Sequence, residues 1–213
     1  MQLIDLTMPL RPGMRGVEFE TARRLDRDGW NALTVHLYSH AGTHMDAPSH
    51  FVDGAETIDQ VALERCVGKA EVVDLTSLKP RESIMPQHLA GAERRILPGC
   101  RLLLHTGWSR NLGKEDYRTH FPRISLTLAQ WLVQRGVVLV GVDCPSVADV
   151  NNLEELTAVH RAFLSAGVVI VEDLVNLDLL EGKTFQLIVL PLKLQGGDGS
   201  PARAVALVED LRA

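Results

Sequence analysis

Three histidines and one aspartate lie within eleven residues of the chain, in the stretch HAGTHMDAPSH at positions 40–50. Imidazole nitrogens and carboxylate oxygens are ligand types that suit Zn²⁺, Mn²⁺ or Fe²⁺. A site of this kind that keeps one position open for water can carry out hydrolysis. His40, His44, Asp46 and His50 therefore predict a catalytic metal centre.

The spacing of these residues differs from that of a helical zinc motif. His40 and His44 are four residues apart, but Gly42 between them and Pro48 after them disfavour a continuous helix. We expect a tight turn that folds the ligands inward. A closed structural site or a surface run of histidines is the alternative. Structural zinc sites favour cysteine ligands, however, and this stretch contains none.

Two other features could carry chemistry. Cys144 could be a nucleophile, although a buried thiol at a strand end is the favoured interpretation. The glycine-rich stretch 196–201 lacks the spacing of a phosphate-binding loop between a strand and a helix. It predicts a hairpin turn, because glycine adopts positive φ at little cost.

Hydrophobic patterns predict the elements that position the cluster. Residues 32–38 alternate between apolar and polar side chains, which predicts a half-buried strand leading into the metal stretch. Residues 101–106 and 137–143 are apolar runs typical of strands buried on both faces. Further strands are expected at 3–7, 70–75, 168–171, 185–192 and 202–208, and a strand or hairpin within 14–31. Helices are expected at 58–66, 86–94, 125–135 and 153–164, with N-caps at Thr57, at Ser125 or Thr127 and at Asn151 or Asn152. Residues 109–123 are expected to form a surface excursion. This pattern is typical of an α/β protein.

Composition and charge exclude several classes of protein. A length of 213 residues favours one domain over 1–213. The net charge of −5 and the lack of a basic stripe argue against nucleic acid as a partner. We expect no membrane segment and a cytoplasmic location, because no long apolar run or basic leader is visible. Cys66, Cys100 and Cys144 are odd in number and scattered, which fits reduced thiols.

The motif HxGTHxDxPxHF over residues 40–51 resembles the signature of the cyclase-like metal-dependent hydrolases, a family that includes bacterial kynurenine formamidases and isatin hydrolases. The blocks DLT at 5–7, LHTGW at 104–108 and DGSPAR at 198–203, together with His160 and Glu172, resemble other recurrent parts of that family. The resemblance therefore extends over nearly the whole chain.

The resemblance implies roles for single residues. It places a first metal on His40, His44 and Asp46, and a second on Asp46, His160 and Glu172, and it makes His50 the acid/base catalyst. It implies one or two ions per chain, zinc or manganese. It also implies a swivelling β/β/α architecture with a mixed sheet core and flanking helices, assembled as homo-oligomers, dimers or larger.

The implied function is hydrolysis of a small amide, an arylformamide, by a metal-activated water and a histidine acid/base. Such an enzyme acts on C–N bonds other than peptide bonds. One alternative is a hydrolase of cyclic amides or lactones, similar to the isatin hydrolases. Another is a non-catalytic metal-binding relative, against which the presence of His50 argues.

The segment 11–31 is expected to choose the substrate. Kynurenine formamidases tend to carry aromatic residues and prolines soon after the first strand, whereas this chain has no tryptophan before Trp30. Arg11 or Arg15 could instead pair with a substrate carboxylate.

Overall fold

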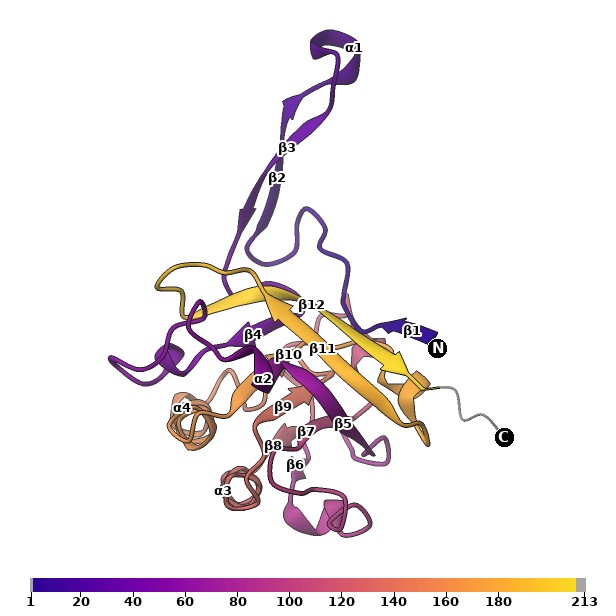
Figure 1. The fold of residues 1–213 in the computed structure, drawn as a ribbon, viewed down its shortest axis with the longest axis vertical. Helices are drawn as coiled ribbons and strands as arrows, with labels where there is room; N and C mark the ends of the chain where they lie inside the picture. Colours follow the sequence, from indigo (N-terminus) through magenta and orange to yellow (C-terminus); the bar gives the residue numbers. More distant parts are fainter. Residues whose placement is uncertain (1, 210–213) are drawn as a thin grey trace.

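An eight-stranded mixed sheet forms the centre of the structure. The structure is a computed structural model that describes residues 2–209 (Figure 1). The strand order is β1-β12-β11-β5-β7-β9-β10-β4, and β12 also pairs with β4, so that the strands from β12 to β4 close into a ring. The strands are β1 (Gln2–Asp5), β4 (His44–Asp46), β5 (Val67–Asp74), β7 (Arg101–His105), β9 (Leu139–Val142), β10 (Val169–Glu172), β11 (Phe185–Pro191) and β12 (Gly199–Val208). The predicted α/β class is confirmed.

Four strands of the ring run parallel. Three of them, β7, β9 and β10, are buried on both faces, as predicted for 101–106 and 137–143, whereas most of β5 is half-buried or exposed. β5, β7, β9 and β10 pair in parallel, and the remaining pairings of the ring are antiparallel. Side chains alternate between two cores: Leu103 packs inside the ring, while Leu102 and Leu104 pack on its outer face.

Two helices cover the outer face of the parallel strands (Figure 1). They are α3 (Leu126–Gln134) and α4 (Leu153–Leu164). Ser125 caps α3 by accepting the Leu128 N–H, and Asn152 caps α4 by accepting the Glu155 N–H. The shorter helices are α1 (Leu25–Asp28), α2 (Leu63–Cys66), η1 (Pro48–His50), η2 (Pro86–Leu89), η3 (Trp108–Asn111) and η4 (Leu177–Leu180), and a small parallel pair consists of β6 (Ser83–Ile84) and β8 (Arg123–Ile124).

A two-stranded arm projects from the body of the molecule, with α1 at its tip (Figure 1). It consists of β2 (Val17–Arg23) and β3 (Ala32–Leu37), which form a separate antiparallel sheet. The predicted strand at 32–38 is confirmed, but its predicted half-burial is wrong, because Leu33 and Val35 are 58% and 47% exposed. An alternating pattern shows which side chains share one face of a strand, but it does not show whether that face is covered. Within the described residues, nothing covers the face of β3 that carries Leu33 and Val35.

Four other expectations differ from the structure. The helix expected at 86–94 is limited to η2 at Pro86–Leu89. The helix expected at 58–66 is limited to α2, because the Thr57 hydroxyl bonds to the Asp59 carboxylate instead of capping a helix. The turn expected over 196–201 ends earlier, and Gly199 already belongs to β12. The excursion over 109–123 is not wholly at the surface, since Tyr117 and Phe121 are buried.

No helix among residues 2–209 combines the length and the apolar character that crossing a membrane would need.

Candidate metal centre

The short strand β4 brings the centre of the HxGTHxD motif into the sheet. β4 lies between β10 and β12, with His44 opposite Glu172 and Asp46 opposite Gly199. Because side chains alternate along a strand, His44 and Asp46 share one face, while Met45 packs into the inner core. Gly42, with φ of 59°, makes the predicted turn before the strand.

Helix α4 and the end of β10 supply the distant half of the centre. His160 and Glu172 are both buried, and they face the β4 side chains. His44 Nε2 lies 3.4 Å from Glu172 Oε2 and 3.5 Å from Asp46 Oδ1. His160 Nε2 lies 3.5 Å from Glu172 Oε1 and 3.7 Å from Asp46 Oδ2.

These four separations exceed those of good hydrogen bonds. Two ligands that each lie about 2.1 Å from one tetrahedral ion are about 3.4 Å apart. The spacing of His44, Asp46, His160 and Glu172 is therefore that of groups that could share a cation.

The backbone fixes the tautomer of two of the histidines. His44 Nδ1 lies 2.7 Å from the Gly42 carbonyl, and His160 Nδ1 lies 2.7 Å from the Leu156 carbonyl. A carbonyl only accepts, so each Nδ1 carries a proton, and Nε2 is the nitrogen that faces the carboxylates and is left to bind a metal. This is the arrangement that metal-binding histidines adopt.

The carboxylate of Asp46 gives a second test of the fit. Its Oδ2 atom is buried and has no hydrogen-bond partner among the described residues. A buried carboxylate oxygen without a partner is costly, and a cation would satisfy it. The donor set present therefore fits a divalent metal ion.

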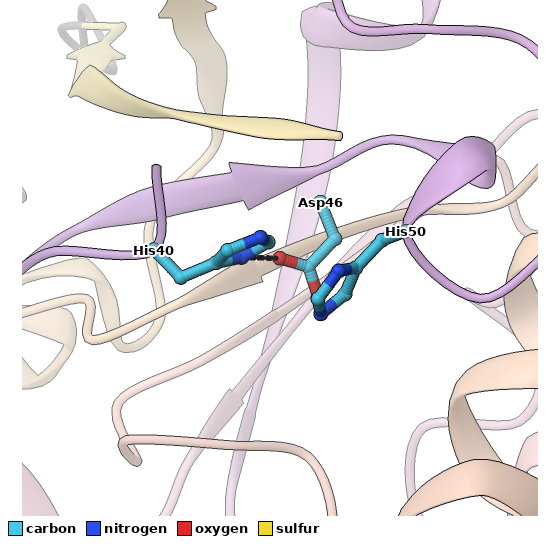
Figure 2. Close-up of side chains that lie close together, drawn as sticks. All are labelled: His40, Asp46 and His50. Atoms are coloured by element: carbon cyan, nitrogen blue, oxygen red, sulfur yellow. Dashed lines mark hydrogen bonds and ion pairs between the residues drawn. The ribbon is translucent and has the colours of Figure 1, made fainter. Parts of the chain in front are cut away.

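His40 lies in a different environment from His44. Its Nδ1 is 2.8 Å from Asp46 Oδ1, the contact drawn in Figure 2, and its Nε2 is 2.9 Å from Asp198 Oδ2. Asp46 thus belongs to two groups of possible ligands, one with His40 and His50 and one with His160 and Glu172.

His50 lies beside the proposed ligands on η1. Its ring stacks on that of His40 with centroids 3.9 Å apart (Figure 2), and its Nδ1 lies 3.2 Å from Asp198 Oδ2. Burial lowers the pKa of His50, the imidazoles of His40 and His160 add to this effect, and the Asp46 charge opposes it. The ring is therefore mostly neutral at neutral pH.

Opposite charges dominate the pKa values in the centre. Burial alone would lower the pKa of His44, but the carboxylates of Glu172 and Asp46 raise it to about 9. The pKa of His160 is raised in the same way, and the two histidines hold the pKa of Glu172 well below its ordinary value against the effect of burial. The carboxylates of Asp46 and Glu172 therefore stabilise a positive charge that lies between them.

All six residues predicted for the site line one cavity of about 240 Å³. Its wall also includes residues that sequence reasoning missed or left open: Arg15, Tyr38, Phe51, Arg118, Pro145, Ser146, Val150 and Leu156. Arg15 is among them, whereas Arg11 is not. Asp198 was also missed, because an aspartate between glycines is typical of a turn; the block DGSPAR was the only signal available.

Cys144 is buried beside the cavity and does not suit a nucleophile. Its Sγ lies 3.2 Å from Thr106 Oγ1, and burial raises the pKa of the thiol well above its ordinary value. A thiol of this kind is inert, which agrees with the favoured interpretation from the sequence.

Comparisons with known proteins agree with the geometry. The model of the Cyclase family, described as "Putative cyclase", matches residues 4–149. A Bacillus cereus protein described as kynurenine formamidase is 33% identical over 211 residues, which cover 95% of this chain and 95% of that protein. The structure of isatin hydrolase A from Ralstonia solanacearum superposes with a TM-score of 0.89 at 26% identity, covering 98% of this chain and 92% of that one.

A further solved structure, described as a potential metal-dependent hydrolase with cyclase activity, superposes with a TM-score of 0.80 at 26% identity and covers 96% of each chain. The family match spans more than half of the sequence, and the Bacillus relative is similar over almost its full length. This chain is therefore a member of the cyclase family.

Proposed function

We propose that this protein is a metal-dependent hydrolase that cleaves the C–N bond of a small arylformamide, with residues 1–213 acting as one domain. The observation that carries the proposal is the convergence of four imidazoles and two carboxylates on one cavity, where the Asp46 Oδ2 atom lacks a hydrogen-bond partner among the described residues. The similarity to a kynurenine formamidase supports the choice of substrate.

Two overlapping ligand sets would hold the metal. His40, His44 and Asp46 would bind one ion, and Asp46, His160 and Glu172 a second. Nitrogen and oxygen ligands suit zinc or manganese, with one or two ions per chain. When bound, the metal supplies a Lewis acid that polarises the amide carbonyl and lowers the pKa of water toward about 7.

His50 would move the proton. Its Nδ1 faces the Asp198 carboxylate at 3.2 Å, which leaves Nε2 as the basic atom. His50 would take a proton from the attacking water at Nε2 and deliver it to the departing amine nitrogen as the C–N bond breaks. The products are formate and an aryl amine. Because the pKa of His50 is lowered, the ring is available as a base at neutral pH.

A hydrolase of cyclic amides or lactones is the second candidate. It is favoured by the likeness to the isatin hydrolases from Ralstonia solanacearum and from Labrenzia aggregata, the latter with a TM-score of 0.88 at 25% identity. A non-catalytic metal-binding protein is disfavoured, because such a protein has no need of His50 within the same cavity.

The arm supports a homo-oligomer, a dimer or larger. Its exposed apolar side chains include Trp30 at 57% and Leu33 at 58%, and apolar surface of this kind is stabilised by contact with a second copy. Light scattering of the wild type and of a Trp30→Ser/Leu33→Ser variant tests this, and a monomeric wild type contradicts it. We also propose a cytoplasmic location, because Cys66, Cys100 and Cys144 are all free thiols.

Steady-state assays with formanilide, isatin and a simple lactone decide among these functions. We expect formanilide to be hydrolysed, chelator to abolish the activity, and added zinc or manganese to restore it. Metal analysis of protein purified without added metal gives the ion and its stoichiometry. Preferred turnover of isatin would favour the second candidate, and an absence of turnover on all three substrates, with metal bound, would contradict both.

A further inference from the structure

The ladder between β4 and β10 ends beside the metal centre. Its last pair is His44 and Glu172, two of the proposed ligands. The residue after Glu172 is Asp173, whose φ of 57° lies in the left-handed region, where most of the other described residues are glycines. A residue with a Cβ is disfavoured in this conformation, so its surroundings must hold it there. The conformation of Asp173 decides how the backbone leaves Glu172.

Three hydrogen bonds hold Asp173, one at each polar part of the residue. Its N–H donates to the Cys144 carbonyl at 2.9 Å, its carbonyl accepts the Thr43 hydroxyl at 2.6 Å, and its carboxylate accepts the Tyr117 hydroxyl at 2.5 Å. All four residues are buried, so a bond lost here leaves a buried polar group unsatisfied. The three partners come from separate segments of the chain, and together they fix the left-handed conformation from outside.

Thr43 connects the two halves of the metal centre. It precedes His44 in the HxGTHxD motif, and its hydroxyl bonds to the residue that follows Glu172. The same hydroxyl accepts the Met8 N–H at 2.9 Å, so it acts as donor and as acceptor at once. Among the described residues, Thr43 is not one that lines the metal-centre cavity. Its hydroxyl therefore joins the turn before β4 to the end of β10 instead of facing a substrate.

Tyr117 reaches Asp173 from the segment 109–123. Its carbonyl accepts the Trp108 indole N–H at 2.8 Å, which anchors its backbone, and its hydroxyl ends on the Asp173 carboxylate. Tyr117 lines a neighbouring cavity of about 390 Å³ but not the metal-centre cavity. Phenylalanine at this position would keep the buried ring and remove only the hydroxyl bond.

The Glu172 carboxylate has to meet two histidines at once. Its Oε1 accepts the Val147 N–H at 2.8 Å and lies 3.5 Å from His160 Nε2. Its Oε2 lies 3.4 Å from His44 Nε2. Ligand groups must be held within about 0.5 Å of the binding geometry. A changed backbone direction after Glu172 would move its carboxylate relative to β4 and α4, and would therefore change these separations.

We propose that Thr43 and Tyr117 are positioning residues of the metal centre. They hold Asp173 in its left-handed conformation and thereby set the Glu172 carboxylate against the two histidines. This inference rests on the metal binding that the proposed function requires. It extends the centre to two side chains that line no part of the metal-centre cavity.

Metal titration of the apo protein tests the assignment without a substrate. Zinc or manganese is added in competition with a chromophoric chelator, and the binding step that is weakened in Glu172→Gln is the one to follow. Tyr117→Phe and Thr43→Val each remove one hydroxyl at nearly constant shape, whereas Thr43→Ser keeps the hydroxyl. Ser125→Ala is the control, since it removes the cap of α3 and Ser125 lines neither cavity.

We expect Tyr117→Phe and Thr43→Val to weaken the Glu172-dependent step by about 10–100-fold, the usual effect of a residue that supports a metal ligand. Thr43→Ser should bind metal nearly as tightly as the wild type. Ser125→Ala should lower the Tm but leave the affinity unchanged, which separates a loss of stability from a loss of ligand geometry.

Substitutions at Asp173 separate its conformation from its charge. Asp173→Gly and Asp173→Ala both remove the carboxylate that Tyr117 contacts, but only glycine adopts the left-handed conformation at little cost. Asp173→Gly should therefore bind metal more tightly than Asp173→Ala. In the Asp173→Gly background, Tyr117→Phe should have no further effect, because the hydrogen bond between the two side chains is already absent.

Unchanged affinity in either Tyr117→Phe or Thr43→Val would overturn the inference, and so would equal affinities of Asp173→Gly and Asp173→Ala. If Glu172→Gln binds metal as the wild type does, the inference fails even where formanilide is hydrolysed. A wild type that binds metal without hydrolysing formanilide contradicts the proposed function alone, and the titrations then still decide the role of Thr43 and Tyr117. A wild type that binds no metal contradicts both.

Discussion

The Oδ2 atom of Asp46 lies 3.7 Å from Nε2 of His160, and no donor among the described residues lies within hydrogen-bond distance of that oxygen. One residue comes from a strand near the start of the chain and the other from helix α4. The Oδ1 atom of the same carboxylate faces His40 and His44. Asp46 is therefore the one residue through which both proposed ligand sets are joined.

Replacing Asp46 should remove the metal from both sets. We expect Asp46→Asn to lose bound metal and to lower turnover of formanilide by more than about a hundredfold. Replacing a residue that only hydrogen-bonds to a metal ligand already lowers metal affinity or activity by about 10–100-fold. Mass spectrometry of the metal content and steady-state kinetics check this. Asp178→Asn, a change at an exposed carboxylate, is the control and should behave as the wild type. Full metal content with normal turnover in Asp46→Asn would contradict the assignment.

Removing the metal should also destabilise the fold. A ligand present at a thousand times its Kd stabilises the native state by about 4 kcal/mol. For a chain of this size that corresponds to a fall in Tm of roughly 8–16 °C on treatment with chelator, at about 2–4 °C per kcal/mol. Calorimetry of the wild type and of Asp46→Asn, with and without chelator, measures this fall in Tm. The variant should show almost no response to chelator, and an equal response would mean that the metal binds elsewhere.

Asp198 is expected to act as a positioning residue. Its Oδ2 atom lies 2.9 Å from His40 Nε2 and 3.2 Å from His50 Nδ1, so it holds both rings. Asp198→Ala should lower kcat for formanilide by about 10–100-fold with little change in KM. Asp198→Asn keeps an oxygen acceptor and should recover part of the loss. A general loss of folding would lower the amount of active enzyme equally in both variants and would give no such recovery.

The local part of the site could be predicted from the sequence, because His40, His44, Asp46 and His50 are close along the chain. The distant pair, His160 and Glu172, followed only from the family resemblance. No periodicity places a helix histidine beside a strand-end glutamate. Asp198 was missed, since its turn-like surroundings explain it without any further role, and only the family block DGSPAR pointed to it.

The fold shows the same limit. Apolar runs predicted β7 and β9 well, because a strand that is buried on both faces has apolar residues at nearly every position. The alternation in β3 was equally clear, but it could not show that the strand lies on a projecting arm. Tyr117 was assigned to the surface because its neighbours are polar, and only the tertiary contacts of its ring and hydroxyl bury it.

Gly199 is expected to be required for a reason other than turn geometry. A Cβ at this position would lie 2.6 Å from His40 Cε1 and 2.8 Å from the Met45 carbonyl, so His40 or β4 would have to move. Gly199→Ala should weaken metal binding, lower kcat, and cost about 1–3 kcal/mol of stability through overpacking. Gly91→Ala, where a Cβ meets nothing within 4 Å, is the control. Unchanged metal content and kinetics in Gly199→Ala would contradict this view of the packing.

Asp143 should give the protein an unusual dependence of stability on pH. Its Oδ1 accepts the N–H and hydroxyl of Thr106 at 2.9 and 2.6 Å, but Oδ2 is buried with no partner among the described residues. Burial raises the pKa of Asp143 against the effect of these hydrogen bonds. The folded state then holds the proton more tightly than the unfolded state. Stability contributed by this group is therefore lost as the pH rises from about 4 through the raised pKa.

Asp143→Asn removes this titration and keeps an oxygen acceptor for Thr106. Relative to wild type, the variant should gain free energy of unfolding as the pH rises from 4 to 7, measured by urea unfolding of both metal-free proteins. Asp74→Asn should give the opposite trend and at lower pH, with free energy of unfolding lost relative to wild type as the pH rises toward about 4, because hydrogen bonds from the Thr76 N–H and hydroxyl lower the pKa of Asp74. Asp74 contributes stability above pH about 4 that is lost as the pH falls through its lowered pKa. Parallel curves for wild type and Asp143→Asn would show that the buried oxygen is satisfied, and that Asp143 titrates equally in both states.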